Sequence, residues 1–372
     1  MPEAGPNFVS LQHESRAVGA DWHRWRRGIG LALALLAGGV AGVAAEARVA
    51  PAAPPLLSNL LMDSQGNKIA TRRAWNRQRE ELLQQWKEVL GPLPKRRAAL
   101  EPEVLATEQQ SGFTRQHLRY QVEPGVHTDG YLLLPAGRKG RGPAVVVFHP
   151  TTPFGARGVA GLEPTYEEAK WHGVHLVQRG YVVWCPRNYI NTEEADWAGN
   201  AARVKQRHPD WTGMTRMVWD AIRAADFLET LPQVDRNRIG CLGHSLGAKV
   251  VLYAMAFDPR YQAGVSSEGG IGLRFSNWDA VWYLGPGIRK ADFKLENHTV
   301  LALVAPRAFL LIGGDSADSD QSVTFLDAVR PVYELWGAGE RLQWLNHHQG
   351  HRYPAEARAR AEAFLDQHLK QR

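Results

Sequence analysis

The stretch RIGCLGHSLGAKVVLYAMAF, residues 238–257, decides the fold of this chain. Its first six residues predict a buried strand, and the residues from 247 onward predict a helix. Between them lies the pattern G-x-S-x-G, with Ser245 at its centre. Glycine on either side permits a sharp turn from strand to helix, which presents the serine hydroxyl at the carboxyl edge of a parallel sheet. The stretch therefore predicts that Ser245 is a nucleophile.

Strands alternate with helices on both sides of this turn. We expect strands at 113–123, 130–135, 144–149, 181–185, 238–243, 262–267, 308–313 and 341–346. We expect helices at 69–90, 166–179, 212–230, 247–257, 322–336 and 355–369. Parallel strands need crossover connections, and the helices in those connections cover both faces of the sheet. The predicted fold class is α/β, with a mostly parallel central sheet of about eight strands.

The amino-terminal segment has the three parts of a secretory signal. Arginines precede an uncharged apolar stretch over 28–45, and small residues follow it. We expect a signal peptide over 1–47, a linker over 48–62 and one catalytic domain over 63–372 that starts with a helix and carries an irregular insertion near 271–298. The protein is then periplasmic or extracellular, without stable membrane insertion after the signal is cleaved. A retained amino-terminal anchor is the alternative.

Composition excludes several classes of protein. The 44 Lys and Arg residues outnumber the 38 Asp and Glu residues by only 6, with no basic run, so we expect no nucleic-acid partner. Two cysteines exclude a disulfide framework and a cysteine-based zinc site. Cys185 and Cys241 are expected on the strands that flank the strand at 144–149, about 9.5 Å apart, which is too far for a disulfide. We expect no metal and no cofactor.

A serine hydroxyl needs a base, and histidine is the usual one. In strand-turn-helix hydrolases of this kind the chain order is serine, acid, histidine. His351 lies between the last predicted strand and the last predicted helix, with Gly350 before it and Pro354 after it. His347 and His348 are competitors that we expect to end the strand. His351 is therefore the predicted base.

Three carboxylates compete for the role of orienting acid. Glu268 follows the strand next to the elbow strand, whereas Asp315 and Asp318 follow the strand after that. The later loop is the standard position, but its usual spacing falls on Ala317, so both aspartates miss it. We favour Glu268 and keep Asp318 and Asp315 as alternatives.

Two backbone N–H groups are expected to form the oxyanion hole. One belongs to Leu246, the residue after the nucleophile. The other comes from the loop after the strand at 144–149, where Pro150 has no N–H and Thr151 is the predicted donor.

Together these residues resemble the α/β-hydrolase superfamily over nearly all of 60–370, and within it the dienelactone-hydrolase-like and acetyl-xylan-esterase-like group. The segment SSEGGIGL over 266–273 is also similar to the part of glucuronoyl esterases that supplies a glutamate acid. That resemblance implies that Glu268 is the acid and that Lys249 contacts a sugar. The alternative for Lys249 is a carboxylate partner within the fold. Two departures stand out: glucuronoyl esterases have an arginine where this chain has Leu246, and dienelactone hydrolases have a cysteine at the position of Ser245.

Tryptophan is abundant, with 13 residues in the chain. Trp278 and Trp282 lie in the irregular insertion, beyond the carboxyl edge of the sheet where binding clefts form. Their rings are candidates for stacking on sugars, and packing of the insertion onto the sheet is the alternative.

The pattern as a whole predicts an exported serine carboxylesterase that works through an acyl-enzyme. Its predicted substrate is an ester on a polysaccharide, of acetyl or uronic-acid type, or a small ester. Two alternatives remain open: a serine peptidase of the same fold, and a carbohydrate-binding scaffold without catalysis.

Overall fold

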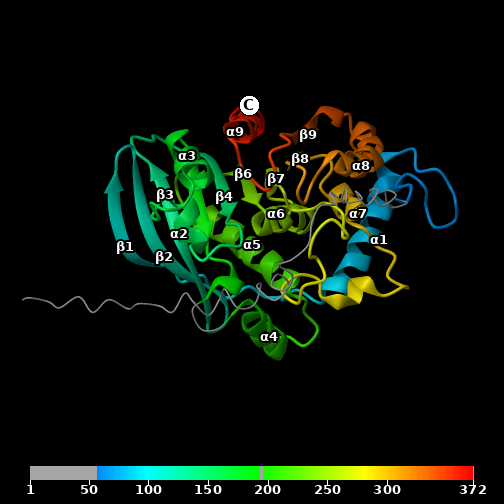
Figure 1. Cartoon of the computed structure of the whole chain (residues 1–372), viewed down its shortest axis with the longest axis horizontal. Helices are drawn as coiled ribbons and strands as arrows, with labels where there is room; N and C mark the ends of the chain where they lie inside the picture. The colour runs from blue at the N-terminus through cyan, green and yellow to red at the C-terminus, as the bar shows by residue number, and fades with distance from the viewer. Residues whose placement is uncertain (1–56, 193–195, 372) are drawn as a thin grey trace, which may run out of the picture. The chain divides into compact units, whose positions relative to one another are not determined.

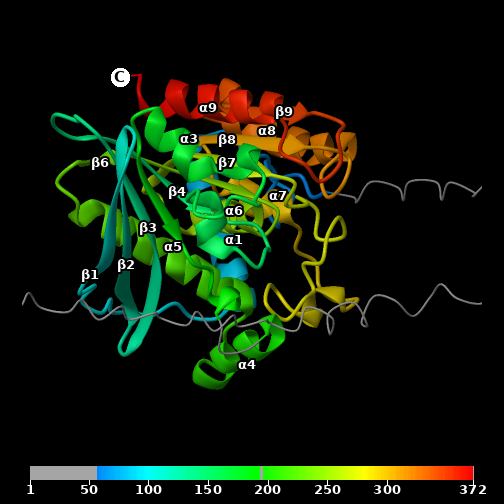
Figure 2. The same cartoon turned by 60° about the vertical axis from the view of Figure 1, so that its left-hand side comes forward.

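A computed structural model describes residues 57–192 and 196–371 of the chain, and Figures 1 and 2 show it from two directions. The described strands form one nine-stranded sheet in the order β1-β2-β3-β5-β4-β6-β7-β8-β9. The strands are β1 (Glu103–Gln110), β2 (Phe113–Glu123), β3 (Val126–Pro135), β4 (Gly142–Phe148), β5 (Val182–Pro186), β6 (Val234–His244), β7 (Tyr261–Ser267), β8 (Ala308–Gly313) and β9 (Leu342–Asn346).

The described helices run between these strands. The α-helices are α1 (Arg72–Leu90), α2 (Gly155–Val159), α3 (His172–Gln178), α4 (Trp197–Arg207), α5 (Gly213–Thr230), α6 (Leu246–Phe257), α7 (Asn297–Ala302), α8 (Val323–Leu335) and α9 (Ala355–Leu369). Short 3₁₀ helices are η2 (Glu168–Lys170), η3 (Tyr189–Asn191), η4 (Pro286–Arg289), η5 (Asp320–Ser322) and η6 (Gly339–Arg341). None of the helices in the described ranges is both long and apolar enough to cross a membrane.

The sheet has an antiparallel part and a parallel part. β1, β2 and β3 pair antiparallel, and β3 pairs antiparallel with β5. From β5 onward every pair, through β4, β6, β7, β8 and β9, is parallel. The carboxyl ends of these parallel strands therefore share one edge of the sheet, which is where the loops that carry candidate functional residues begin.

Helices cover both faces of the sheet because its central strands are apolar on both sides. In β4, Val145 and Val147 pack into the cluster that includes α2, α3 and α9. Ala144 and Val146, which point the other way, pack into the cluster that includes α1, α5, α6, α7 and α8. Strands buried on both faces are typical of parallel sheets. The predicted α/β fold class, with helices on both faces, is confirmed.

Some element predictions need correction. The sheet has nine strands rather than about eight, because β1 was not predicted: all eight of its residues are exposed, so it has no apolar alternation. The helix expected over 166–179 is only the short η2 followed by α3. The insertion near 271–298 is irregular as expected, apart from η4 and the start of α7.

The predicted signal peptide over 1–47 lies outside the described residues. Of the predicted linker, residues 57–62 are described and contact the rest of the fold. Leu60 is buried in its core, and the hydroxyl of Ser58 lies 2.9 Å from Nε2 of His298.

Candidate active site

Ser245 occupies the sharp turn between β6 and α6. Its backbone has φ 57° and ψ −117°, a left-handed conformation that L-residues seldom adopt. The turn is tight enough to exclude side chains from its flanks: a Cβ on Gly243 would lie 2.2 Å from the carbonyl carbon of Gly247, and a Cβ on Gly247 would lie 2.0 Å from the oxygen of Phe148. The two glycines of the pattern are therefore required by the close approach of backbone.

His351 lies between Ser245 and Glu268. Its Nε2 is 2.9 Å from the Ser245 hydroxyl oxygen, and its Nδ1 is 3.1 Å from Oε2 of Glu268. An ionised carboxylate only accepts hydrogen bonds, so Nδ1–H donates to Glu268 and Nε2 is left to accept from the serine hydroxyl. The structure thus brings together three residues that are up to 106 positions apart in the chain.

Backbone N–H groups hold the carboxylate of Glu268, which is completely buried. Ala317 donates to Oε2 at 2.8 Å and Asp318 to Oε1 at 3.4 Å, and the N–H of Gly314 also donates to Oε1. A buried carboxylate needs such donors to offset its lost hydration. The loop after β8 is the standard position for the acid. In this chain that loop supplies N–H donors to Glu268, which follows β7.

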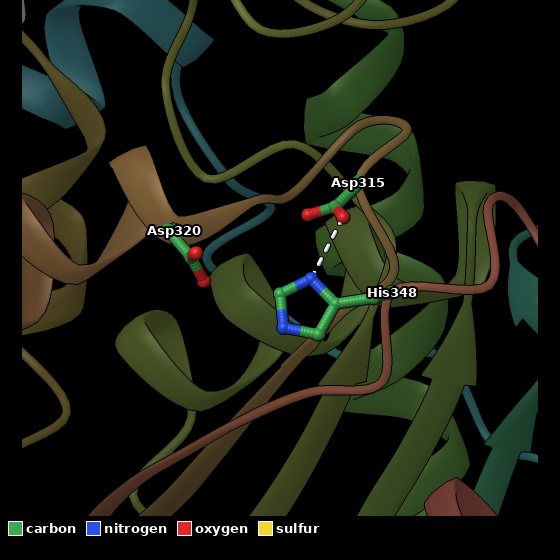
Figure 3. Close-up of side chains that lie close together, drawn as sticks. All are labelled: Asp315, Asp320 and His348. Carbon is green, nitrogen blue, oxygen red and sulfur yellow. Dashed lines mark hydrogen bonds and ion pairs between the residues drawn. The ribbon is translucent and has the colours of Figure 1, made fainter.

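Asp318 and Asp315 are engaged elsewhere. Both oxygens of the buried Asp318 accept backbone N–H groups, from Gly270 and Ile271, at 2.7 Å each. Burial raises the pKa of Asp318. The exposed Asp315 accepts from Nδ1 of His348 at 2.8 Å (Figure 3). Of the three carboxylates considered, the structure places only Glu268 against His351.

The same loops contain the one group of side chains, among the described residues, that has the spacing of metal ligands. Ligand atoms of Asp315, Asp320 and His348 all lie within 4.8 Å of one another (Figure 3). All three residues are exposed, and the amide of Asn346 donates to both carboxylates, at 2.7 and 2.8 Å. Asn346 and His348 therefore supply hydrogen bonds to these carboxylates without an ion. The expectation of no metal stays a prediction.

His347 and His348 do not reach Ser245. His347 is buried against Gly314: a Cβ on that glycine would lie 2.3 Å from Cε1 of the imidazole. His348 is exposed and paired with Asp315, as described above.

The two predicted oxyanion donors, Leu246 and Thr151, both lie near the serine in the structure. Leu246 opens α6, and N–H groups in the first turn of a helix have no partner within the helix. Thr151 lines the same cavity as Ser245. The loop before Thr151 is fixed by His149, whose Nδ1–H donates to the oxygen of Pro150 at 2.8 Å and whose Nε2 accepts from the N–H of Asn188 at 2.9 Å. Burial lowers the pKa of His149 to about 4, so this ring is neutral.

A cavity of about 360 Å³ opens over Ser245. Its lining residues come from the strand ends and from the insertion: Thr151, Ser245, Lys249, Glu268, Phe275, Ser276, Asn277, Tyr283, Ser316, Ala317 and His351. Sequence analysis missed Phe275, Ser276, Asn277 and Tyr283. Only their position beyond the carboxyl edge of the sheet could have indicated them, because an irregular segment has no periodicity.

Lys249 reaches this cavity from the second turn of α6. Its Nζ donates to the oxygen of Gly269 at 2.5 Å and to the hydroxyl of Ser276 at 2.9 Å, and it lies 5.1 Å from the centre of the Trp278 ring. Burial lowers the pKa of Lys249 to about 8. Its hydrogen-bond partners are uncharged, and the nearby carboxylates of Asp318 and Glu268 interact with it through their charge.

The two tryptophans expected to stack on sugars pack against protein. Trp278 is 1% exposed, and its Nε1–H donates to the oxygen of Gly270 at 2.7 Å. Of the two possibilities kept open for Trp278, the structure shows packing against protein: its ring lies 5.6 Å from that of Tyr253 in α6. Trp282 is half-buried, contacts the ring of Trp197 at 5.8 Å and does not line the cavity.

Comparisons with known proteins agree with this fold. The model of a family described as the prolyl oligopeptidase family matches residues 174–372, which is more than half of the chain. The Bacillus subtilis (strain 168) protein YtaP, whose name describes a hydrolase, is 24% identical over 305 residues, covering 78% of this chain and 100% of YtaP. Carbohydrate esterase MZ0003, from an unknown prokaryotic organism, is 27% identical over 137 residues, covering 31% of this chain and 32% of that protein.

Among solved structures, a glucuronoyl esterase from Solibacter usitatus superposes with a TM-score of 0.68 at 20% identity, covering 84% of this chain and 98% of that one. At this level of identity, the similarity establishes a shared fold. The predicted resemblance to the fold of these esterases is confirmed.

Proposed function

The chain belongs to the prolyl oligopeptidase family, and from that membership and the geometry of its site we propose that it is a serine esterase that hydrolyses carboxylic esters. The observation that carries the proposal is the hydrogen-bonded series Ser245–His351–Glu268, with contacts of 2.9 and 3.1 Å. A nucleophile, a base and an orienting acid in this arrangement perform acyl transfer on several unrelated folds.

The reaction proceeds in two halves. His351 Nε2 accepts the proton of Ser245 as the hydroxyl oxygen attacks the ester carbonyl, and Glu268 stabilises the imidazolium that forms. The N–H of Leu246 and the loop at Thr151 donate to the developing oxyanion. The imidazolium then protonates the leaving alcohol, which leaves an acyl group on Ser245. Water, deprotonated by the same imidazole, releases the acid and restores the serine.

The lining of the cavity favours a polar substrate. Lys249, Ser276 and Asn277 present donors and acceptors above the serine. Two of the similar proteins are named a carbohydrate esterase and a glucuronoyl esterase. We therefore propose an ester on a carbohydrate, of acetyl or uronic-acid type, as the substrate, with Lys249 as a sugar contact.

We also propose that the esterase is exported. The support is the arginine-flanked apolar stretch over 28–45, which is typical of a secretory signal. Amino-terminal sequencing of the protein recovered from the native envelope or medium tests this: a mature end near residue 47 is expected, and an intact amino terminus contradicts it.

Substitution of the nucleophile tests the proposed reaction. Ser245→Ala is expected to lower kcat on p-nitrophenyl acetate by about 10⁴-fold or more and to abolish labelling by a fluorophosphonate probe. Ser316→Ala is the matched control, because Ser316 is an exposed serine in the same cavity. An alanine variant at 245 that hydrolyses the ester at the wild-type rate contradicts the proposal.

A peptidase is the second candidate, favoured by the name of the family. Acetylated xylan, a methyl ester of glucuronic acid and a set of peptide p-nitroanilides separate the two activities. Ester turnover without amide turnover excludes the peptidase, and the reverse result excludes the esterase.

A further inference from the structure

Four aromatic rings form a continuous group behind the candidate nucleophile. The ring centre of His351 lies 4.9 Å from that of His244, and the ring of His244 lies 5.8 Å from that of Tyr353. Tyr353 in turn contacts His172 edge-on at 4.4 Å. Three separate elements supply this group: the end of β6, the loop before α9 and the start of α3.

The two hydrogen bonds of His351 leave one feature of its geometry unconstrained. Both lie in the ring plane, one at each nitrogen, and the side chain of His351 is 45% exposed. They fix the line from Ser245 to Glu268, but the ring remains free to tilt about that line. The ring of His244 contacts that of His351 at 43° between the ring planes, and this contact restricts the tilt.

His244 is itself held firmly. It is 1% exposed, and its Nδ1 lies 3.2 Å from the hydroxyl oxygen of Ser267. The carbonyl oxygen of Ser267 also accepts the N–H of Ser245 at 2.8 Å. One residue of β7 therefore fixes both the nucleophile and the ring beside the base.

We propose that His244, supported by Tyr353, is a positioning residue that keeps the imidazole of His351 at the tilt needed for proton transfer. This inference rests on the proposed function, because it assigns His351 as the base. Displacement of a reacting group by about 1 Å costs up to about 100-fold in rate, so a ring that sets this tilt has a measurable effect on kcat.

The charge state of His244 is compatible with the role. Burial, together with the nearby His351 and His172, holds the pKa of His244 well below its ordinary value, so the ring is neutral beside the imidazolium that forms in the reaction. Lys170 and His347 also face it and act in the same direction.

Variants at position 244 test the proposal. His244→Ala is expected to lower kcat per active site by about 10- to 100-fold with KM unchanged, and to change the midpoint of the acid limb of the pH profile, since water then reaches the inner face of His351. His244→Phe keeps a ring and is expected to stay within about 5-fold of wild type. His244→Gln keeps a polar side chain without a ring and should behave as alanine does, which preserves the test if the alanine variant does not fold.

The matched control is His298→Ala, since His298 is also a buried imidazole and is not among the residues that line the cavity. It should lower stability without altering kcat per active site or the pH profile. Active sites are counted by fluorophosphonate labelling, so that loss of folded protein is not scored as loss of rate. Wild-type kcat per labelled site in both His244→Ala and His244→Gln would overturn the proposal.

One readout separates this proposal from the esterase assignment. The titration of His351 is followed by NMR in wild type and in His244→Ala, without substrate. A changed titration with no ester turnover in wild type contradicts the esterase but leaves the contact between the rings supported. An unchanged titration and an unchanged rate contradict the positioning role alone.

Discussion

Glu268 has a positive φ of 55°, no exposed surface and oxygens surrounded by N–H groups. The strain and the desolvation are both offset by the loop after β8, which wraps its backbone donors around the carboxylate. Glu268 directly follows β7, the strand next to β6, whereas Asp315 and Asp318 follow β8, which is one strand farther from Ser245. Side-chain length and loop donors together explain why a glutamate suits this position.

Replacement of the acid gives a first prediction. In Glu268→Gln the amide group faces Nδ1 of His351 and favours the wrong tautomer, so kcat is expected to fall by about 10³-fold or more. Asp315→Asn is the matched control, because Asp315 is exposed and paired with His348. Steady-state kinetics on p-nitrophenyl acetate measures both. Equal losses in the two variants, or an unaffected Glu268→Gln, would refute the assignment of the acid.

For individual residues, the sequence predicted where the catalytic candidates lie in the chain better than it predicted which side chains contact one another. The G-x-S-x-G pattern and the last loop indicated Ser245 and His351, which the structure places 2.9 Å apart. The sequence left the choice among three candidate acids open, because carboxylates that follow neighbouring parallel strands all lie at one edge of the sheet. The sequence also left the role of Trp278 open, since nothing in an irregular segment tells whether a ring faces solvent or the core.

At the scale of elements, the elbow depends on backbone contacts between β4, β6 and α6. A Cβ at Gly247 would meet the carbonyl oxygen of Phe148, the last residue of β4, at 2.0 Å. Backbone cannot yield as a flexible side chain does. The position of the elbow over the sheet therefore depends on glycine at 247.

Gly247→Ala is accordingly expected to destabilise the fold by about 1–3 kcal/mol and to remove most activity. Gly287→Ala is the matched control: a Cβ there meets no atom within 4 Å, so stability should be unchanged or slightly higher. Urea unfolding followed by fluorescence measures both variants. A Gly247→Ala protein as stable and as active as wild type would show that the elbow is looser than described.

The predictability of the elements follows from their burial. β8 and α9 were predicted with their observed bounds, because an apolar run and a helix that begins directly after Pro354 have clear limits. β1 was missed because an edge strand with every residue exposed carries no pattern of burial. The lining residues of the insertion, such as Tyr283, were missed because their positions depend on the packing of the whole segment onto the sheet.

For the whole molecule, buried histidines determine the response to acid. His149, His172, His244 and His298 are each at most 2% exposed. Burial lowers the pKa of His149 and of His298 to about 4 and that of His172 to about 3, and holds the pKa of His244 well below its ordinary value. In the unfolded chain all four take up protons below about pH 6.5.

Through these four groups the unfolded state binds more protons than the native state between pH 6.5 and pH 4, so their contribution to the free energy of unfolding falls as the pH falls. Burial raises the pKa of Asp318 and raises that of Asp220 to about 6, and these two carboxyl groups offset part of the fall. Each histidine contributes up to about 1.4 kcal/mol per pH unit in this window. Urea unfolding at pH 7, 6 and 5 is expected to show a steep loss, and His298→Gln should flatten it by roughly one histidine's share. A stability that is constant from pH 7 to pH 5 would contradict this account.

The open position of His351 has a consequence for how a large substrate is processed. The imidazole of His351 lines the cavity and has nearly half of its surface in solvent, so among the described residues the base is open to a substrate that approaches from solution. For the esterase proposed here, an ester group in the middle of a polysaccharide chain is as accessible to the active site as one at the end of the chain. Deacylation of an intact, insoluble fibre then needs no prior depolymerisation.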